Sequence, residues 1–153
     1  MKRFLTPVFL LALLAALPAG CSNPAKLIAV GLKIEVTGIE RAADGSVTAT
    51  WQVDNSNVVS YLVSHVSHKI YLNGTYLGIV KDEEPMGIPA SAKAARTSKL
   101  KDGDASAARA VAEAAASGSG SYRIESVIVF RLYDDNVQRS ELSGSGTTNV
   151  TAK

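Results

Sequence analysis

The chain has 153 residues, of which 46 % are hydrophobic, with 16 lysines and arginines against 14 aspartates and glutamates. This composition can bury a core, so it excludes the highly charged stress proteins that stay disordered. No basic face stands out, and we therefore expect no nucleic acid partner.

The chain begins with Met1-Lys2-Arg3, continues with an apolar run over 4–16, and reaches small residues at Ala19-Gly20. This layout is typical of a secretory signal. The apolar run is too short for a membrane-spanning helix, which needs about 20 residues. We expect residues 1–20 to be removed as a signal peptide, and with Lys2 and Arg3 gone the remaining chain carries 14 charges of each sign.

Cys21 is the only cysteine and follows LPAG at 17–20. The segment resembles the lipobox of bacterial lipoproteins, with Pro18 where leucine usually stands. The resemblance implies a diacylglyceryl group on the Cys21 thiol and a second acylation on its new amino group, and two or more acyl chains anchor a protein stably. By the same resemblance, Ser22 implies the outer membrane, with the domain facing the periplasm. The alternative is an ordinary signal peptide with a chance cysteine.

Residues 21–30 are expected to form a tether, and residues 31–150 a single domain. Leu32, Ile34 and Val36 alternate with polar residues, and the same period of two runs through 47–53. This alternation predicts two half-buried strands. The polar segment 54–57, Asp-Asn-Ser-Asn, ends the second strand.

Asn73-Gly74 lies between two β-rich runs and predicts a hairpin with a type I′ turn. A two-residue loop pairs Leu72 with Thr75 and Tyr71 with Tyr76, which makes the tyrosines a cross-strand pair. The same register places four apolar side chains on one face, namely Ile70, Leu72, Leu77 and Ile79.

Residues 86–101 suggest a further strand, at an edge because of Pro89. The alanine-rich segment 105–116 predicts a helix with Asp104 as N-cap and Gly118 at its end, lying across one end of a sheet. Residues 122–136 predict a strand that is apolar on both faces and is therefore expected to be central. Leu132 is expected on the same face as Phe130. A weaker last strand over 139–150 has Gly144 and Gly146 as candidate bulges.

About seven strands with turn signals every 8–12 residues or so predict an all-β protein. The expected architecture is an antiparallel β-sandwich of the immunoglobulin or fibronectin type III kind, with one short helix.

The order of these segments resembles the late-embryogenesis-abundant (LEA) type 2 family, also called the water-stress and hypersensitive-response domain. The matching segments are VDNSN (53–57), KIYLNGTYLG (69–78), MGIPA (86–90) and SYRIESVIVF (121–130), with the helix before the last of these. Where the family commonly has Asn-Pro-Asn, this chain has Asn55-Ser56-Asn57. The resemblance implies a sandwich fold and a non-enzymatic role in desiccation or other stress.

Several residues invite a chemical role, and each has a structural explanation that we favour. His65 and His68 are three apart, so on a strand they point to opposite faces, and we expect no metal there. Ser98 and Lys101 match a Ser-x-x-Lys pattern, but in a β context. The acidic segments 82–84 and 134–135 are expected to be solvated turns, and the tyrosines are expected to pack between strands.

No nucleophile and base can be placed together from the sequence, so we expect no enzyme, no cofactor and no catalytic residue. Two functions remain open. The first is an envelope module, anchored to the membrane through Cys21, that protects or supports structure under stress. The second is an adaptor that binds a specific envelope protein complex or lipid.

Overall fold

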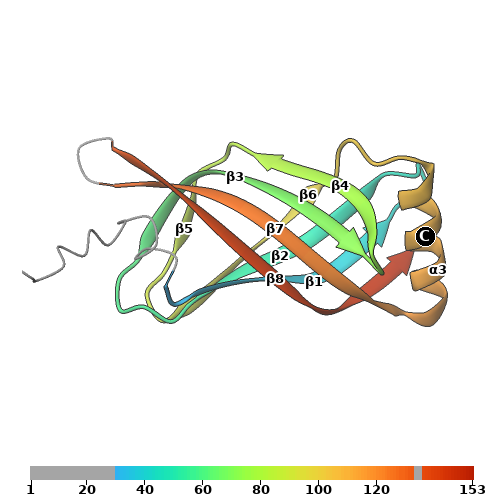
Figure 1. Cartoon of the computed structure of the whole chain (residues 1–153), viewed down its shortest axis with the longest axis horizontal. Coiled ribbons are helices and arrows are strands. Elements are labelled where there is room, and N and C mark those ends of the chain that lie inside the picture. Colours follow the sequence, from blue (N-terminus) through green and yellow to red (C-terminus); the bar gives the residue numbers. More distant parts are fainter. Residues whose placement is uncertain (1–29, 133–135) are drawn as a thin grey trace, which may run out of the picture.

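The computed structural model describes residues 30–132 and 136–153 (Figure 1). The expected signal peptide, Cys21, all of the tether except its last residue, and Asp134-Asp135 lie outside these residues. The elements are β1 (Leu32–Arg41), β2 (Val47–Asn55), β3 (Tyr61–Leu72), β4 (Thr75–Asp82), β5 (Met86–Ile88), β6 (Ala92–Lys99), α3 (Ala105–Ser117), β7 (Ser119–Arg131) and β8 (Val137–Ala152).

The all-β class with one short helix is confirmed, but the architecture differs from the expected antiparallel sandwich. All eight described strands belong to one sheet, in the order β4-β3-β7-β8-β1-β2-β6, with β5 paired to β3. Gly38–Arg41 of β1 runs parallel to Asn149–Ala152 of β8, so the sheet is mixed. Its two ends meet where Ile79 and Lys101 exchange backbone hydrogen bonds of 2.8 and 2.9 Å.

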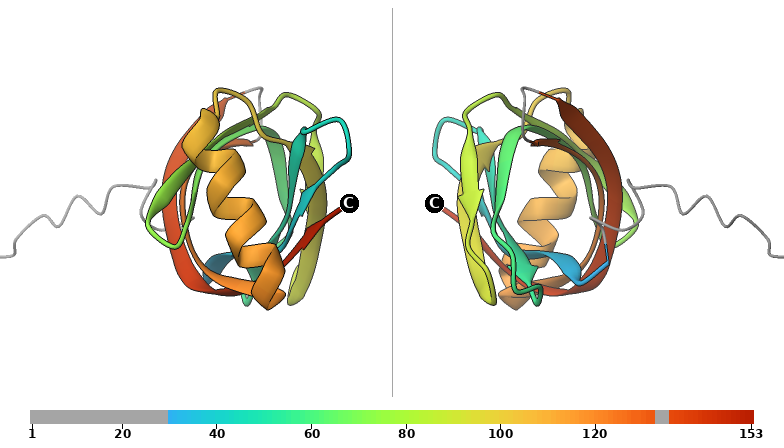
Figure 2. Two further views of the ribbon diagram at one scale, coloured as in Figure 1. Left: turned by 90° about the vertical axis from the view of Figure 1, so that its right-hand side faces the viewer. Right: turned by 90° about the vertical axis from the view of Figure 1, so that its left-hand side faces the viewer.

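The sheet curls around its own core, and α3 lies across one end (Figure 2). Register shifts interrupt three strand pairs, between Val36 and Gly38, between Val63 and His65, and between Ile70 and Tyr71. A bulge increases the local twist and bends its strand. These shifts account for one strongly curled sheet in place of two stacked ones.

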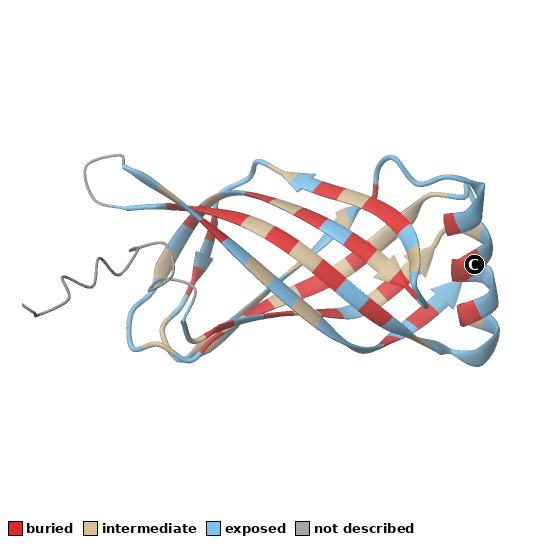
Figure 3. Ribbon diagram, in the orientation of Figure 1, coloured by how far each residue is buried: buried red, intermediate tan, exposed pale blue. Residues whose placement is uncertain are grey.

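The period-two alternation of the sequence appears directly in the burial of the strands (Figure 3). In β1 and β2 the inward residues are buried and their neighbours are half-buried or exposed. The largest side chains enclosed by the sheet are Trp51, Phe130, Ile34, Ile39, Ile70, Leu72, Leu77, Ile88, Ile124 and Ile128. Without a disulfide among the described residues, burial of this apolar surface stabilises the fold.

The predicted hairpin is confirmed at its turn and wrong further along. Asn73 and Gly74 have φ angles of 49° and 83°, as a type I′ turn requires, and Tyr71 pairs with Tyr76. Ile70 then pairs with Gly78 rather than Leu77. This bulge turns Ile79 off the core face and puts Val80 there instead.

The helix and its caps are confirmed. Asp104 Oδ1 accepts hydrogen bonds from the backbone N–H groups of Ser106 (2.8 Å) and Ala107 (3.1 Å), and Gly118 ends α3 with a φ of 75°. The buried face of α3 consists of small residues, namely Ala107, Ala110, Val111 and Ala114. Small side chains let the helix approach the open end of the curled sheet closely.

β7 pairs with both β3 and β8 and is an interior strand, as predicted. Leu132 was expected on its core face but lies beyond its end and is exposed. The predicted bulges at Gly144 and Gly146 are wrong, because the β7–β8 register runs unbroken. A Cβ on Gly144 would lie 2.1 Å from the Ile34 carbonyl oxygen, so this glycine allows β8 to cross closely over β1.

Pro89 lies in the connection between β5 and β6. β5 pairs only with β3, and β6 is the terminal strand of the sheet path. The prediction of an edge position for this part of the chain therefore holds, and the proline breaks one expected strand into two.

Candidate functional site

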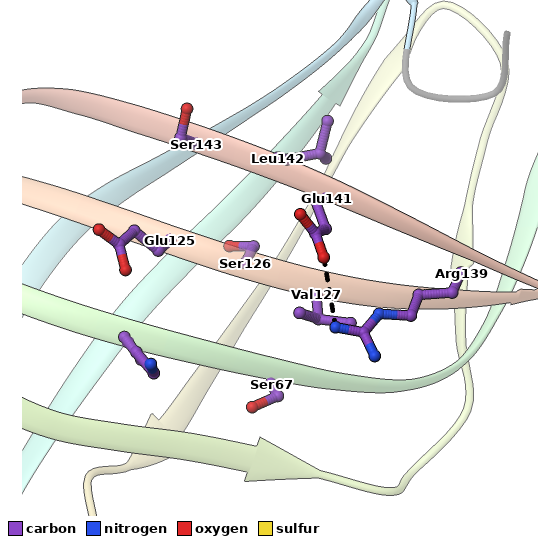
Figure 4. Close-up of a pocket in the computed structure, with 9 residues that line it drawn as sticks. Ser67, Glu125, Ser126, Val127, Arg139, Glu141, Leu142 and Ser143 are labelled. Atoms are coloured by element: carbon purple, nitrogen blue, oxygen red, sulfur yellow. Dashed lines mark hydrogen bonds and ion pairs between the residues drawn. The ribbon is translucent and has the colours of Figure 1, made fainter. Parts of the chain in front are cut away.

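A polar groove crosses the outer face of β3, β7 and β8 (Figure 4). It has a volume of about 460 Å³ and is lined by Ser67, Lys69, Glu125, Ser126, Val127, Arg139, Glu141, Leu142 and Ser143. The strand register explains this lining, because Lys69 lies opposite Glu125 on β3 and β7, and Glu125 lies opposite Ser143 on β8. The groove is therefore built from cross-strand rows on rigid elements.

Both carboxylates of this groove have a cationic partner. Arg139 Nη2 lies 3.2 Å from Glu141 Oε1, and Arg123 forms an ion pair with Glu125. All four side chains are largely exposed. Pairs of this kind contribute little energy and leave no carboxylate poised as a general acid or base. The open, charge-balanced groove suits weak polar contacts better than tight binding of an apolar ligand.

Ser126, on the floor of the groove, forms a buried pair with His68. His68 Nδ1 lies 2.9 Å from Ser126 Oγ, and the His68 ring meets the Trp51 ring edge-on at 4.4 Å between centroids. Burial lowers the pKa of His68 to about 4, against a smaller opposing effect of the Asp82 carboxylate. Nε2 of His68 has no hydrogen-bond partner among the described residues.

This pair corrects the expectation that no nucleophile and base come together. The arrangement is nevertheless a poor catalyst. Both residues are buried, and within 30–132 and 136–153 no carboxylate hydrogen-bonds the imidazole. A base with a pKa near 4 also accepts protons weakly at neutral pH. The pair is best described as a buried polar contact in which Nδ1 of His68 is hydrogen-bonded and Nε2 is not.

His65 is exposed and lies on the opposite face of β3 from His68, as strand parity predicts. The bulge in this strand lies at Ser64, before His65, so it does not bring the two rings together. Within 30–132 and 136–153, no three side chains of histidine, cysteine, aspartate or glutamate are grouped as metal ligands. Cys21, the predicted lipid attachment site, lies outside these ranges.

A second polar network joins β2, β4 and β6. Arg96 Nη1 lies 3.0 Å from Asp82 Oδ1, Ser98 Oγ donates to Asp82 Oδ2 at 3.3 Å, and Trp51 Nε1–H donates to Ser98 Oγ at 3.2 Å. Arg96 also donates to the carbonyl oxygens of Glu84 and Pro85. Burial alone would raise the pKa of Asp82, but its hydrogen bonds and the Arg96 charge hold that pKa below its ordinary value.

This network corrects the prediction that Asp82 belongs to a solvated turn, since its side chain is only 17 % exposed. It also gives Ser98 a structural role on β6, in agreement with the β context that argued against the Ser-x-x-Lys pattern. The tyrosines pack as expected. Tyr61 lies against Phe130, and Tyr71 lies against Tyr76 with Arg123 above its ring.

Asn55 is the residue that sequence reasoning missed most clearly. It is fully buried, and its Nδ2 donates to the carbonyl oxygens of Val59 (2.9 Å) and Pro89 (2.8 Å). Its Oδ1 accepts from the backbone N–H of Asn57. The asparagine-rich break and the proline-bearing segment, two parts of the LEA type 2 pattern, are thus held together by one side chain. The signal in the sequence was an asparagine at the end of an alternating strand.

The same loop holds the point where the chain enters the domain. Asn57 Nδ2 donates to the Val30 carbonyl oxygen at 2.9 Å, and the Ser56 backbone N–H donates to the Gly31 carbonyl oxygen at 2.9 Å. No helix in the described part of the chain has the length and apolarity to cross a bilayer.

No protein-family profile matches the chain, and no curated protein matches it either. Solved structures do match. The solution structure of an Arabidopsis thaliana protein is 14 % identical, with a TM-score of 0.50, and covers 79 % of each chain. The solution structure of a putative LEA protein is 10 % identical, with a TM-score of 0.41, and covers 99 % of this chain and 95 % of its own.

A crystal structure of an Archaeoglobus fulgidus protein is 16 % identical, with a TM-score of 0.42, over 78 % of this chain and 95 % of its own. The structural neighbours thus include a LEA protein. At these identities the likeness concerns the fold alone, and of these three structures only the Arabidopsis one reaches a TM-score of 0.5.

Proposed function

We propose that this chain is a non-enzymatic envelope lipoprotein, anchored through Cys21, whose LEA type 2-like domain has a protective or structural role under desiccation or osmotic stress. The observation that carries the proposal is the Asn55 side chain. It bonds the asparagine-rich break to the proline-bearing segment, so the parts of the LEA type 2 pattern cooperate in one three-dimensional feature.

The polar groups of the domain favour a role without turnover. The carboxylates of the groove are ion-paired and exposed, and the buried histidine is neutral at physiological pH. A reaction would need a poised acid, base or nucleophile in contact with substrate. The groove offers none, whereas a folded domain with a polar surface fits a module that contacts other molecules weakly.

The anchor sets the working distance of the domain. Residues 22–29 lie between Cys21 and Val30, and eight residues span at most about 28 Å at ~3.5 Å each. The domain therefore works close to the membrane that holds it, and by resemblance of the lipobox and Ser22 that is the outer membrane, on its periplasmic side.

An adaptor role is the second candidate, and the groove over β3, β7 and β8 favours it. Its charged rows could match complementary rows on a partner protein of the envelope. Affinity purification from a detergent extract separates the two roles, because an adaptor co-purifies with one stoichiometric partner and a protective module does not.

Survival after drying tests the protective role. A deletion strain should grow normally in rich medium but survive drying or osmotic shock less well than its parent. The wild-type gene should restore survival, and Cys21→Ser should restore only part of it, because the domain folds but is no longer held at the membrane. A deletion strain that survives drying as well as its parent would contradict the protective role and favour the adaptor.

A further inference from the structure

Exposed apolar side chains are concentrated at one end of the domain. Among the described residues, seven large apolar side chains are exposed. Six of them lie in segments at the end opposite α3, and only Tyr76, in the β3–β4 hairpin, lies elsewhere. The six are Val30, Val58, Val59, Leu62, Leu132 and Val137.

The strand register and the loop contacts arrange these six in two groups at the same end, one on β3, β7 and β8 and one around the β2–β3 loop. Leu62 pairs with Arg131, and Arg131 pairs with Val137, so the three form one row across β3, β7 and β8. Leu132 follows Arg131 directly. Figure 1 shows the start of β1, the β2–β3 loop and the neighbouring ends of β7 and β8 at the same end of the molecule. We call this set of six residues the apolar end.

The β2–β3 loop carries the most accessible part of the apolar end. Val58 is 88 % exposed and Val59 is 51 % exposed, although Asn55 holds the backbone of this loop from within the core. Two adjacent valines presented to solvent by this loop contribute nothing to the stability of the fold. Several exposed apolar side chains at one end of a domain indicate an interaction site.

The chain itself indicates the partner. Val30, where the chain enters the domain, belongs to the apolar end and is bonded to the β2–β3 loop. The eight residues from 22 to 29 connect it to Cys21, so an anchor at Cys21 holds this end within about 28 Å of the bilayer. Such a tether raises the local concentration of the apolar end at the membrane surface far above that in bulk.

One cationic side chain at the apolar end, Arg131, suits a lipid surface. Arg131 is exposed between Leu62 and Val137, and a long cationic side chain can place its guanidinium among lipid phosphates while its neighbours bury apolar atoms. Asp54, where β2 meets the loop, is neutralised by Lys93 at 3.7 Å.

We propose that the apolar end docks on the bilayer that holds Cys21, with Val58 and Val59 in the headgroup region and Arg131 at the phosphates. This proposal rests on the proposed anchoring at Cys21. Docking orients the long axis of the domain away from the membrane and places α3 farthest from it. The groove over β3, β7 and β8 then stays open on the side of the molecule.

The test uses the full lipidated chain in vesicles of phosphatidylethanolamine and phosphatidylglycerol. Because Cys21 is acylated under the proposal, one introduced cysteine can be labelled selectively with an environment-sensitive fluorophore. Val58→Cys and Val137→Cys report the apolar end, and Ala112→Cys, on the exposed face of α3, is the matched control. Flotation with the vesicles reports anchoring independently of the label.

Docking predicts that the chain floats, and that the labels at 58 and 137 shift to the blue and lose quenching by aqueous iodide. The label at 112 should stay fully quenched. Adding Val58→Asp to the Val137→Cys chain should restore quenching while flotation persists. If the chain floats but iodide quenches all three labels equally, docking is wrong, the anchor stands, and a protein partner for this end is favoured. If the chain floats and all three labels are shielded from iodide, docking at this end is also wrong while the anchor stands. If the chain does not float, the anchoring proposal itself fails and docking fails with it.

Discussion

His68 and Ser126 form a hydrogen bond of 2.9 Å inside the core, with the His68 ring against Trp51. Burial disfavours the charged imidazolium, so the pKa of His68 falls from 6.5 to about 4. Below pH 6.5 the unfolded chain takes up a proton at this residue and the folded chain does not. Stability should therefore fall as the pH drops from 6.5 to 4, by roughly 3 kcal/mol at ~1.4 kcal/mol per pH unit, and this contribution should level off below pH 4.

Urea unfolding at several pH values measures this dependence. His68→Gln should be less stable at neutral pH but should lose the slope between pH 6.5 and 4, whereas the exposed His65→Gln should keep it. A slope retained in His68→Gln would assign the acid sensitivity to other groups.

Gly74→Val should destabilise the β3–β4 hairpin by about 1–3 kcal/mol, because a β-branched residue is strained at a φ of 83°. Thermal unfolding measures the loss. Gly87→Val is the matched control, since Gly87 has an ordinary strand conformation with open space beside it. Equal melting temperatures for the two variants would show that the turn does not require glycine.

Asn55→Ala should cost about 1–3 kcal/mol, because it removes the buried side chain that donates to the carbonyl oxygens of Val59 and Pro89. Asn149→Ala removes an exposed asparagine from β8 and should leave the urea midpoint near that of the wild type. The Asn55 variant should also loosen the β2–β3 loop, seen as faster hydrogen exchange at Asn57. Unchanged exchange would contradict the role of Asn55 in holding this loop.

Gly144→Ala should destabilise the domain by about 3 kcal/mol, because its Cβ would lie 2.1 Å from the Ile34 carbonyl oxygen and the backbone must move. The comparison with Gly87→Ala in thermal unfolding separates this close approach from a general effect of replacing glycine. If Gly144→Ala and Gly87→Ala have the same melting temperature, β8 does not cross β1 as closely as in the structure.

The local elements were predictable because their signals are local. Alternation marked β1 and β2, Asn73-Gly74 marked the hairpin turn, and Asp104 and Gly118 marked the ends of α3. The parallel pairing of Gly38–Arg41 with Asn149–Ala152 joins segments more than a hundred residues apart, and no residue pattern announces it. No residue pattern indicates the bulge at Leu77 either, so the sequence analysis places Ile79 on the wrong face of β4.

The candidate site was harder to predict for a related reason. His65 and His68 were correctly separated by strand parity, but the contact of His68 with Ser126 depends on the β3–β7 register. Asn55 looked like part of a polar break, because its hydrogen bonds to the Val59 and Pro89 carbonyl oxygens join segments that come together only in the folded chain. Asp82 looked solvated until Arg96 and Ser98 of β6 were placed beside it.

The proposed function and the docking of the apolar end both depend on acylation of Cys21, and one measurement tests it directly. Cells that express the wild-type chain or Cys21→Ser are grown with radiolabelled palmitate, and the immunoprecipitated protein is counted. The account predicts label in the wild-type chain and none in Cys21→Ser, which should also be missing from the membrane fraction or remain as uncleaved precursor. Equal labelling of the two chains, or no label in the wild type, would contradict the account.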